Sequence, residues 1–239
     1  MRTELLDTAP IPGGDSELGL YARGGDLLIK IVGGQDLMST RTHGSEDALG
    51  ETVCAEFAEV EGPRILIGGL GMGFTLSAAL RQLGTDAEVI VAELVPVVVE
   101  WNRGALGAYA GDPLRDERVS VREGDVSVLL RTELSGFDAI ILDVDNGPQG
   151  LILEANHWLY SQGGLAASYR ALRSGGVLAV WSAGPDRAFS KRLHKTGFEV
   201  SEVRVRAHRC KGARHVIWMA RKPGKRARSA VKEPPESRS

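Results

Sequence analysis

Cysteine is scarce in this sequence, with 2 among 239 residues, Cys54 and Cys210. They lie far apart and outside any CxxC pattern, so we expect neither a disulfide framework nor a zinc site, and no metal-binding residues are proposed. No segment approaches the roughly 20 apolar residues of a membrane-spanning helix. Residues 1–12 show no basic segment followed by an apolar one, so no signal peptide is predicted. We therefore expect a cytoplasmic protein with no membrane partner.

Aromatic residues are also few, at 5% of the chain, beside 43% hydrophobic and 25% charged residues. These values suit an ordinary globular protein and exclude collagen and wholesale disorder. The net charge of −2 is spread unevenly along the chain. Residues 1–63 carry 12 acidic and 4 basic side chains, whereas residues 221–239 carry 2 acidic and 7 basic ones. The tail from Pro223 to Ser239 has little to bury, so it is predicted to be disordered.

Short strands separated by glycine pairs are predicted in the acidic head, at residues 18–22, 27–32 and 36–39. Ser45 and the two acids after it predict the start of a helix with the serine hydroxyl as its cap. From residue 64 onward short apolar strands alternate with helical patterns, which is typical of a parallel sheet covered on both faces. The last two strands, 199–206 and 214–221, are close enough in sequence to be antiparallel. The predicted fold is therefore α/β, with a mostly parallel sheet, an antiparallel last strand and a small N-terminal β-meander.

A glycine loop stands at the first junction of strand and helix, in Ile65-Leu-Ile-Gly-Gly-Leu-Gly-Met-Gly73. Glycine lets the backbone approach a ligand closely, at a helix end whose N–H groups favour polar or anionic groups. Acids then recur at the carboxyl ends of the next three strands, as Glu93, Asp125 and Asp143. Open α/β sheets bind ligands at this edge, and an acid ending the second strand is suited to the two hydroxyls of a ribose. The alternative is that Asp125 and Asp143 only cap the helices after them.

Two kinds of nucleotide ligand compete for this loop. A dinucleotide fold requires G-x-G-x-x-G, but here the third glycine comes one residue early and Phe74 stands in its place. The closer G-x-G-x-G spacing, the position of Asp125 and the closing antiparallel hairpin favour S-adenosylmethionine instead.

Residues 65–178 resemble the spermidine synthase-like family of class I S-adenosylmethionine-dependent methyltransferase folds. Gly68-Gly-Leu-Gly-Met-Gly73 stands where that family has its G-G-G-D-G-G loop, and Val91-Ala-Glu-Leu-Val-Pro-Val-Val-Val-Glu-Trp-Asn-Arg103 is similar to its ribose-binding segment. Gly124-Asp125 matches the adenine-contacting pair, and Phe137-Asp-Ala-Ile-Ile-Leu-Asp-Val-Asp-Asn-Gly-Pro148 looks like the strand and loop that carry D-x-x-D.

The resemblance implies a Rossmann-like nucleoside-binding domain at residues 45–222, between the β-meander at 1–44 and a tail at 223–239. It also implies a homodimer. The cofactor would be S-adenosylmethionine or its decarboxylated form. The residues implied in holding it are Gly68, Gly69, Gly71, Gly73, Glu93, Gly124, Asp125 and Asp143.

Several positions depart from the family pattern. Gly71 replaces the loop aspartate, Val95 replaces a second acid after the ribose acid, and Asn146 takes the second acidic position of D-x-x-D. The tyrosine-histidine-glutamate that grips the polyamine would align with Leu49-Gly50-Glu51, which leaves only the glutamate. A diamine needs several carboxylates to replace its hydration. We therefore expect a methyltransferase that uses S-adenosylmethionine and acts on a small molecule.

Methyl transfer needs a positioned nucleophile and, for oxygen or nitrogen acceptors, a group that removes its proton. The candidate catalytic residues are Asp143 and Asp145, and the candidate substrate-binding residues are His43, Glu51, Asn146 and Gln149. Two alternatives stay open. One is a polyamine aminopropyltransferase that uses decarboxylated S-adenosylmethionine, and the other is a non-catalytic protein that binds a nucleoside, or a nucleic acid through the basic tail.

Overall fold

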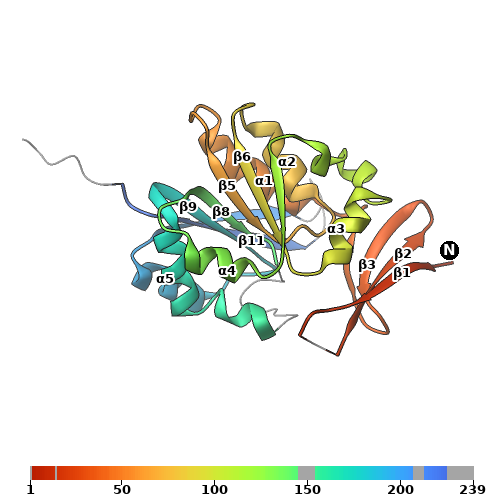
Figure 1. The fold of residues 1–239 in the computed structure, drawn as a ribbon. Coiled ribbons are helices and arrows are strands. Elements are labelled where there is room, and N and C mark those ends of the chain that lie inside the picture. Colours follow the sequence, from red (N-terminus) through yellow and green to blue (C-terminus); the bar gives the residue numbers. More distant parts are fainter. Residues whose placement is uncertain (1, 14, 145–153, 207–212, 225–239) are drawn as a thin grey trace, which may run out of the picture.

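The computed structural model describes residues 2–13, 15–144, 154–206 and 213–224, which form two sheets (Figure 1). The N-terminal sheet is antiparallel, in the order β1-β2-β3-β4. Its strands are β1 (Glu4–Pro10), β2 (Glu17–Arg23), β3 (Asp26–Ile31) and β4 (Asp36–Ser39). The sequence predicted the last three and missed β1. That edge strand is almost entirely exposed, so no buried face marks it with alternating apolar residues.

The larger sheet has seven strands in the order β10-β11-β9-β8-β5-β6-β7. They are β5 (Arg64–Gly68), β6 (Glu88–Glu93), β7 (Val119–Glu123), β8 (Phe137–Leu142), β9 (Leu172–Ser182), β10 (Glu199–Arg206) and β11 (Arg214–Arg221). The five strands β9, β8, β5, β6 and β7 pair in parallel, in that order. Strand β11 pairs antiparallel with both β9 and β10. The predicted α/β fold with a mostly parallel sheet and an antiparallel last strand is confirmed.

Helices cover both faces of the larger sheet, with α1 and α2 on one face and α4 and α5 on the other (Figure 1). The helices are α1 (Gly44–Cys54), α2 (Phe74–Gln82), α3 (Pro96–Arg103), α4 (Val126–Thr132), α5 (Gln162–Ala171) and α6 (Arg187–Thr196). Short 3₁₀ helices are η1 (Ala55–Phe57), η2 (Gly107–Ala110), η3 (Pro113–Arg115) and η4 (Glu154–Trp158). Within β5, Ile65 and Ile67 pack with the helices α1 to α3, and Leu66 packs with α4 to α6. Both faces of the strand are buried, which explains its continuous apolar run.

The start of α1 corrects one prediction. The helix begins at Gly44 with His43 as the preceding residue, and no side chain caps it. Ser45 lies inside the first turn, where its hydroxyl donates a hydrogen bond to Glu46 Oε2 at 2.6 Å. The strand-like bridge between Ser39 and Thr42 brings the chain into the helix earlier than the serine signal indicated.

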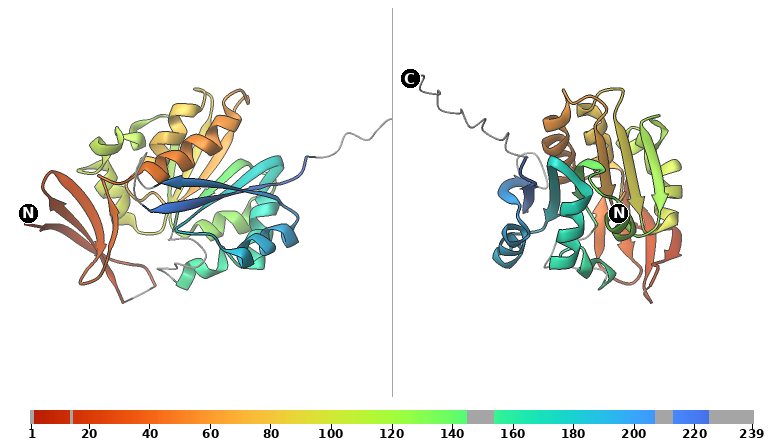
Figure 2. Two further views of the ribbon diagram at one scale, coloured as in Figure 1. Left: turned by 180° about the vertical axis from the view of Figure 1, so that it is seen from behind. Right: turned by 60° about the vertical axis from the view of Figure 1, so that its left-hand side comes forward.

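The N-terminal sheet packs against the large domain near α3 and η2, at one end of the molecule (Figure 2). Leu18 and Ile29 belong to the same apolar core as the residues of α3. Trp101 Nε1 donates to Asp7 Oδ2 at 2.8 Å, and the Tyr109 hydroxyl donates to the carbonyl oxygen of Gly25 at 2.8 Å. These contacts hold the small sheet beside the carboxyl ends of the parallel strands.

No helix among the described residues is long and apolar enough to cross a membrane. Of the tail predicted to be disordered, residues 225–239 lie outside the described residues. Cys210 lies outside them as well.

Candidate functional site

The glycine loop connects β5 to α2 at the carboxyl edge of the large sheet. Gly69, Gly71 and Gly73 all have positive φ angles, of 89°, 52° and 82°. The Gly69 N–H donates to the carbonyl oxygen of Ala92 at 2.8 Å, and a Cβ atom on Gly69 would lie 2.3 Å from the carbonyl oxygen of Asp143. Glycine is therefore required at position 69 both by its backbone conformation and by the close approach of the end of β8.

Glu93 ends β6 and holds the loop from the side. Its side chain is buried, with Oε2 accepting a hydrogen bond from Leu70 N at 2.8 Å and Oε1 accepting one from Val95 N at 2.9 Å. Burial raises the pKa of this carboxyl, and the backbone N–H bonds partly oppose that rise. The backbone N–H groups of Gly71 and Leu94 also lower the pKa of Glu93, so the loop and the chain after β6 hold this carboxyl group at the cavity wall.

Asp125 caps α4 and also lines a cavity. Its Oδ1 accepts from Ser127 N at 2.7 Å and its Oδ2 accepts from Ser127 Oγ at 2.6 Å. The N–H of the preceding Gly124 donates to the carbonyl oxygen of Glu93 at 2.7 Å, which ties the ends of β6 and β7 together.

Asp143 follows β8, and its side-chain hydrogen-bond partner among the described residues lies on α2. The Thr75 hydroxyl donates to Asp143 Oδ2 at 2.7 Å. Burial raises the pKa of the Asp143 carboxyl, and the bond from Thr75 lowers it by a smaller amount.

Two neighbouring cavities meet at Asp143. The first, which we call the glycine-loop cavity, is lined by Gly69, Gly71, Glu93, Gly124, Asp125 and Asp143. Its opposite wall is apolar and includes Ile11, Leu18 and Ile29 from the N-terminal sheet. The second, which we call the Thr75 cavity, is lined by Glu46, Phe74, Thr75, Asp143 and Trp181. Both cavities also share Gly71, Leu37, Met38 and Val144, so they adjoin along this wall.

The structure gives two of the predicted loop glycines packing positions instead of cavity-lining ones. A Cβ atom on Gly68 would lie 3.1 Å from both Leu142 and Val126 side chains, and one on Gly73 would lie 2.9 Å from Asn102 Oδ1. Neither glycine lines the described cavities, whereas Gly69 and Gly71 do.

His43, just before α1, and Glu51 within it do not line the two cavities. The His43 ring stacks on Phe74 with centroids 3.9 Å apart, and its Nδ1 lies 2.8 Å from Asp47 Oδ2. Glu51 is exposed and pairs with Arg81 at 3.2 Å, because it is more than one helical turn beyond the cavity. The remaining predicted residues, Asp145, Asn146 and Gln149, lie outside the described residues.

Glu46 is the residue that the sequence interpretation missed. It lines the Thr75 cavity from the first turn of α1. The Thr75 hydroxyl lies 3.4 Å from the Glu46 carbonyl oxygen, and the Ser45 hydroxyl donates a hydrogen bond to the Glu46 carboxylate. Burial, and secondly the charge of Asp143, raise the pKa of Glu46 to about 7. The only signal in the sequence was a pair of acids after His43, which suits any helix start.

The charge around the two cavities has one sign. No lysine, arginine or histidine is among the described residues that line them, whereas four carboxyl groups are: Glu46, Glu93, Asp125 and Asp143. None of these four takes part in an ion pair within the described parts of the chain, since the nearby Arg81 pairs with Asp47 and Glu51 instead. The site is therefore suited to a cationic ligand.

Comparison with known proteins supports the fold. No protein-family model matches the chain, and comparison with curated protein sequences gives no match either. Among solved structures, a spermidine synthase in complex with the transition-state analogue AdoDATO and the spermidine synthase from Thermotoga maritima each match with a TM-score of 0.72 and 17% identity. Each match covers 92% of this chain and 72% of the other.

A probable spermidine synthase from Corynebacterium glutamicum matches with a TM-score of 0.63 and 18% identity, over 91% of this chain and 79% of the other. These similarities confirm the resemblance at the level of the fold and cover the N-terminal sheet as well as the large domain. The chain therefore has the spermidine synthase-like fold of the class I methyltransferase type.

Proposed function

We propose that this chain is a transferase that binds a sulfonium nucleoside in the glycine-loop cavity and transfers an alkyl group from its sulfur to an amine in the Thr75 cavity. The observation that carries the proposal is the pair of adjoining cavities with Asp143 in their common wall. An in-line displacement needs its donor and acceptor side by side in this way. Glu93 would accept hydrogen bonds from the ribose hydroxyls, and Asp125 would contact the adenine.

The charge of the cavities favours decarboxylated S-adenosylmethionine, and therefore aminopropyl transfer. S-adenosylmethionine carries a carboxylate at the end of its amino acid chain, whereas the decarboxylated form ends in an ammonium group. The described lining offers carboxylates and no basic side chain. A carboxylate left without a cationic partner among acidic groups is strongly disfavoured. The solved spermidine synthases of the same fold are consistent with this donor.

Methyl transfer from S-adenosylmethionine is the second candidate, and Gly71 favours it. This glycine stands where the related fold has an aspartate that holds the amino end of the nucleoside. Here the space beside it is filled, because a Cβ atom on Gly71 would lie 2.9 Å from Met38 Sδ. One carboxylate for an aminopropyl group is thus missing, which a methyl donor would not need.

The two donors can be compared by calorimetry on the purified chain. We expect decarboxylated S-adenosylmethionine to bind at least tenfold more tightly than S-adenosylmethionine, about 1.4 kcal/mol, because only the latter brings an unpaired carboxylate. With 1,4-diaminobutane or 1,3-diaminopropane as acceptor, mass spectrometry should detect methylthioadenosine as the nucleoside product. Tighter binding of S-adenosylmethionine with formation of S-adenosylhomocysteine would select the methyltransferase instead. Binding of neither nucleoside by folded protein would reject both.

Replacing Glu93 tests the nucleoside position. Glu93→Gln should weaken binding of either nucleoside by about 1.5–3 kcal/mol, because it removes a charged acceptor for the ribose hydroxyls. Glutamine keeps one oxygen for the backbone N–H groups, so the fold should tolerate it better than alanine. Glu88→Gln, at the exposed far end of the same strand, is the matched control and should leave the dissociation constant unchanged. Equal affinities for wild type and Glu93→Gln would place the ribose elsewhere.

A further inference from the structure

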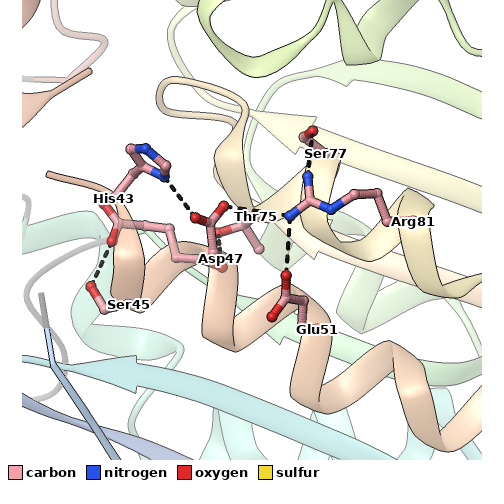
Figure 3. Close-up of polar contacts among 8 residues, drawn as sticks. His43, Ser45, Asp47, Glu51, Thr75, Ser77 and Arg81 are labelled. Carbon is pink, nitrogen blue, oxygen red and sulfur yellow. Dashed lines mark hydrogen bonds and ion pairs between the residues drawn. The ribbon is translucent and has the colours of Figure 1, made fainter. Parts of the chain in front are cut away.

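The first turns of α1 carry three acids that have different partners (Figure 3). Asp47 and Glu51 both contact Arg81, at 3.7 and 3.2 Å, and Asp47 also contacts His43. The Glu46 carboxylate accepts a hydrogen bond from the Ser45 hydroxyl at 2.6 Å, and its other hydrogen-bond contribution comes from its own backbone N–H. Arg81 therefore balances the two acids on the outer side of the helix and leaves Glu46 without a cation.

Glu46 also differs from Asp143 in the cavities that it lines. Asp143 lines the glycine-loop cavity and the Thr75 cavity. Glu46 lines the Thr75 cavity and a third, more open cavity, which we call the His215 cavity and which is lined by Asp36, Thr42, Trp181 and His215. Asp143 does not line that third cavity. Asp143 thus borders the Thr75 cavity and the glycine-loop cavity, whereas Glu46 borders the Thr75 cavity and the His215 cavity.

We infer that Glu46 is the proton acceptor for the attacking amine, and that it releases the proton through the His215 cavity. The inference rests on the proposed function and extends it to a residue outside the matched motifs. Asp143, at the boundary with the nucleoside, would orient the amine through a hydrogen bond. Glu46, at the open end, can lose the proton to water without passing the nucleoside.

The proposed step balances as follows. The primary ammonium of the acceptor gives one proton to the Glu46 carboxylate and becomes a neutral amine. The nitrogen lone pair forms a bond to the carbon attached to sulfur, the C–S bond breaks, and its electron pair stays on sulfur. The sulfonium becomes a neutral thioether, and the product nitrogen carries the positive charge. Glu46 then returns to its carboxylate by releasing its proton to solvent.

The charged and titratable side chains near Glu46 come from several elements of the fold. Asp143 after β8 adds negative charge, Asp36 of β4 and His215 of β11 line the His215 cavity, and Asp47 is the next residue of α1. The positive charge of Arg81 on α2 is directed to Asp47 and Glu51. Burial, and secondly the negative charge of Asp143, raise the pKa of Glu46 to about 7. A carboxyl group with this pKa is suited to act as a general base near pH 7.

The test compares Glu46→Gln with Glu51→Gln in the full chain, using decarboxylated S-adenosylmethionine or S-adenosylmethionine, whichever the wild type consumes, with 1,4-diaminobutane or 1,3-diaminopropane as acceptor. The wild-type kcat/KM for the amine should rise with pH through a midpoint near 7. Glu46→Gln should lose this rising limb and about 100-fold of kcat/KM at pH 8, while the nucleoside Kd changes less than threefold. Glu46→Asp should restore the limb in part. Glu51→Gln should behave as wild type.

The possible failures are distinguishable. If wild-type protein binds neither nucleoside, the proposed function and the inference are both overturned. If it binds and transfers a group, but Glu46→Gln keeps kcat/KM within threefold and the same pH profile, the inference alone is overturned. Thermal melting of each variant shows whether a lost activity reflects lost folding. If Glu46→Gln does not fold, Glu46→Ala decides, because a folded alanine variant that keeps the wild-type rate and pH profile also rejects the inference.

Discussion

Gly69→Ala should destabilise the protein by more than about 4 kcal/mol, enough to prevent most of the chain from folding at 37 °C. Two effects add. An alanine at a φ of 89° costs about 1–2 kcal/mol. In addition, the new methyl group would lie 2.3 Å from the carbonyl oxygen of Asp143, which is backbone at the end of a buried strand and has no freedom to rotate away. The end of β8 would have to move, and the shared wall of the two cavities with it.

Gly25→Ala is the control for the backbone effect alone. Gly25 has nearly the same φ, 92°, but its Cβ position has no atom within 4 Å. This variant should lose only about 1–2 kcal/mol. Urea unfolding followed by circular dichroism measures both. A loss for Gly69→Ala no larger than that for Gly25→Ala would mean that the loop and the end of β8 separate easily, and that the close contact has no structural role.

The sequence allowed most of the large domain to be predicted because its signals are local. Both faces of strands such as β5 and β8 are buried, so each appears as an apolar run that needs no knowledge of its neighbours. The positions of Glu93, Asp125 and Asp143 follow from one further rule, that parallel strands bring their carboxyl ends to the same edge. Strand β1 escaped because an exposed edge strand carries no such pattern.

The acceptor side could not be predicted, because it is assembled by packing between distant segments. Glu46 reaches the Thr75 cavity only because α1 lies against α2, with Gly50 so close that a Cβ atom would be 2.4 Å from the carbonyl oxygen of Thr75. Alignment to a family motif selected Glu51, one and a half turns further along the same helix and paired with Arg81 outside the cavity. Trp181, the residue before the last one of β9, belongs to the apolar core and also lines the Thr75 cavity.

Glu46 and Asp143 connect the stability of the protein to its chemistry. Each is partly buried, with a hydroxyl partner and no cation among the described residues, and burial raises the pKa of both. A bound ammonium group would supply the missing positive charge. The same arrangement that prepares the site for a cationic acceptor therefore makes the unliganded protein less stable at neutral pH than it would be with neutral side chains.

Glu46→Gln should consequently make the unliganded protein more stable than wild type above pH 7, by up to about 3 kcal/mol. The ordinary pKa of this carboxyl is 4.5, which we take for the unfolded chain, and in the folded protein it is about 7. Below pH 4.5 both states hold the proton, so Glu46 adds no pH dependence. Between pH 4.5 and 7 the unfolded state loses the proton first, so wild-type stability falls as the pH rises, by about 1.4 kcal/mol for each unit of the pKa difference. Above pH 7 the penalty is complete and constant.

Urea unfolding of wild type and Glu46→Gln at pH 5, 6, 7 and 8 tests this relation. The difference in unfolding free energy between them should grow from pH 5 to pH 7 and then stay level, while Glu51→Gln, whose carboxylate is exposed and paired with Arg81, should differ from wild type by a nearly constant amount. Addition of 1,4-diaminobutane with the bound nucleoside should stabilise wild type more than Glu46→Gln, since only wild type gains a new ion pair. A difference that does not change with pH would show that the Glu46 carboxyl titrates alike in the folded and unfolded states, and it would then be too acidic in the folded protein to serve as the base near pH 7.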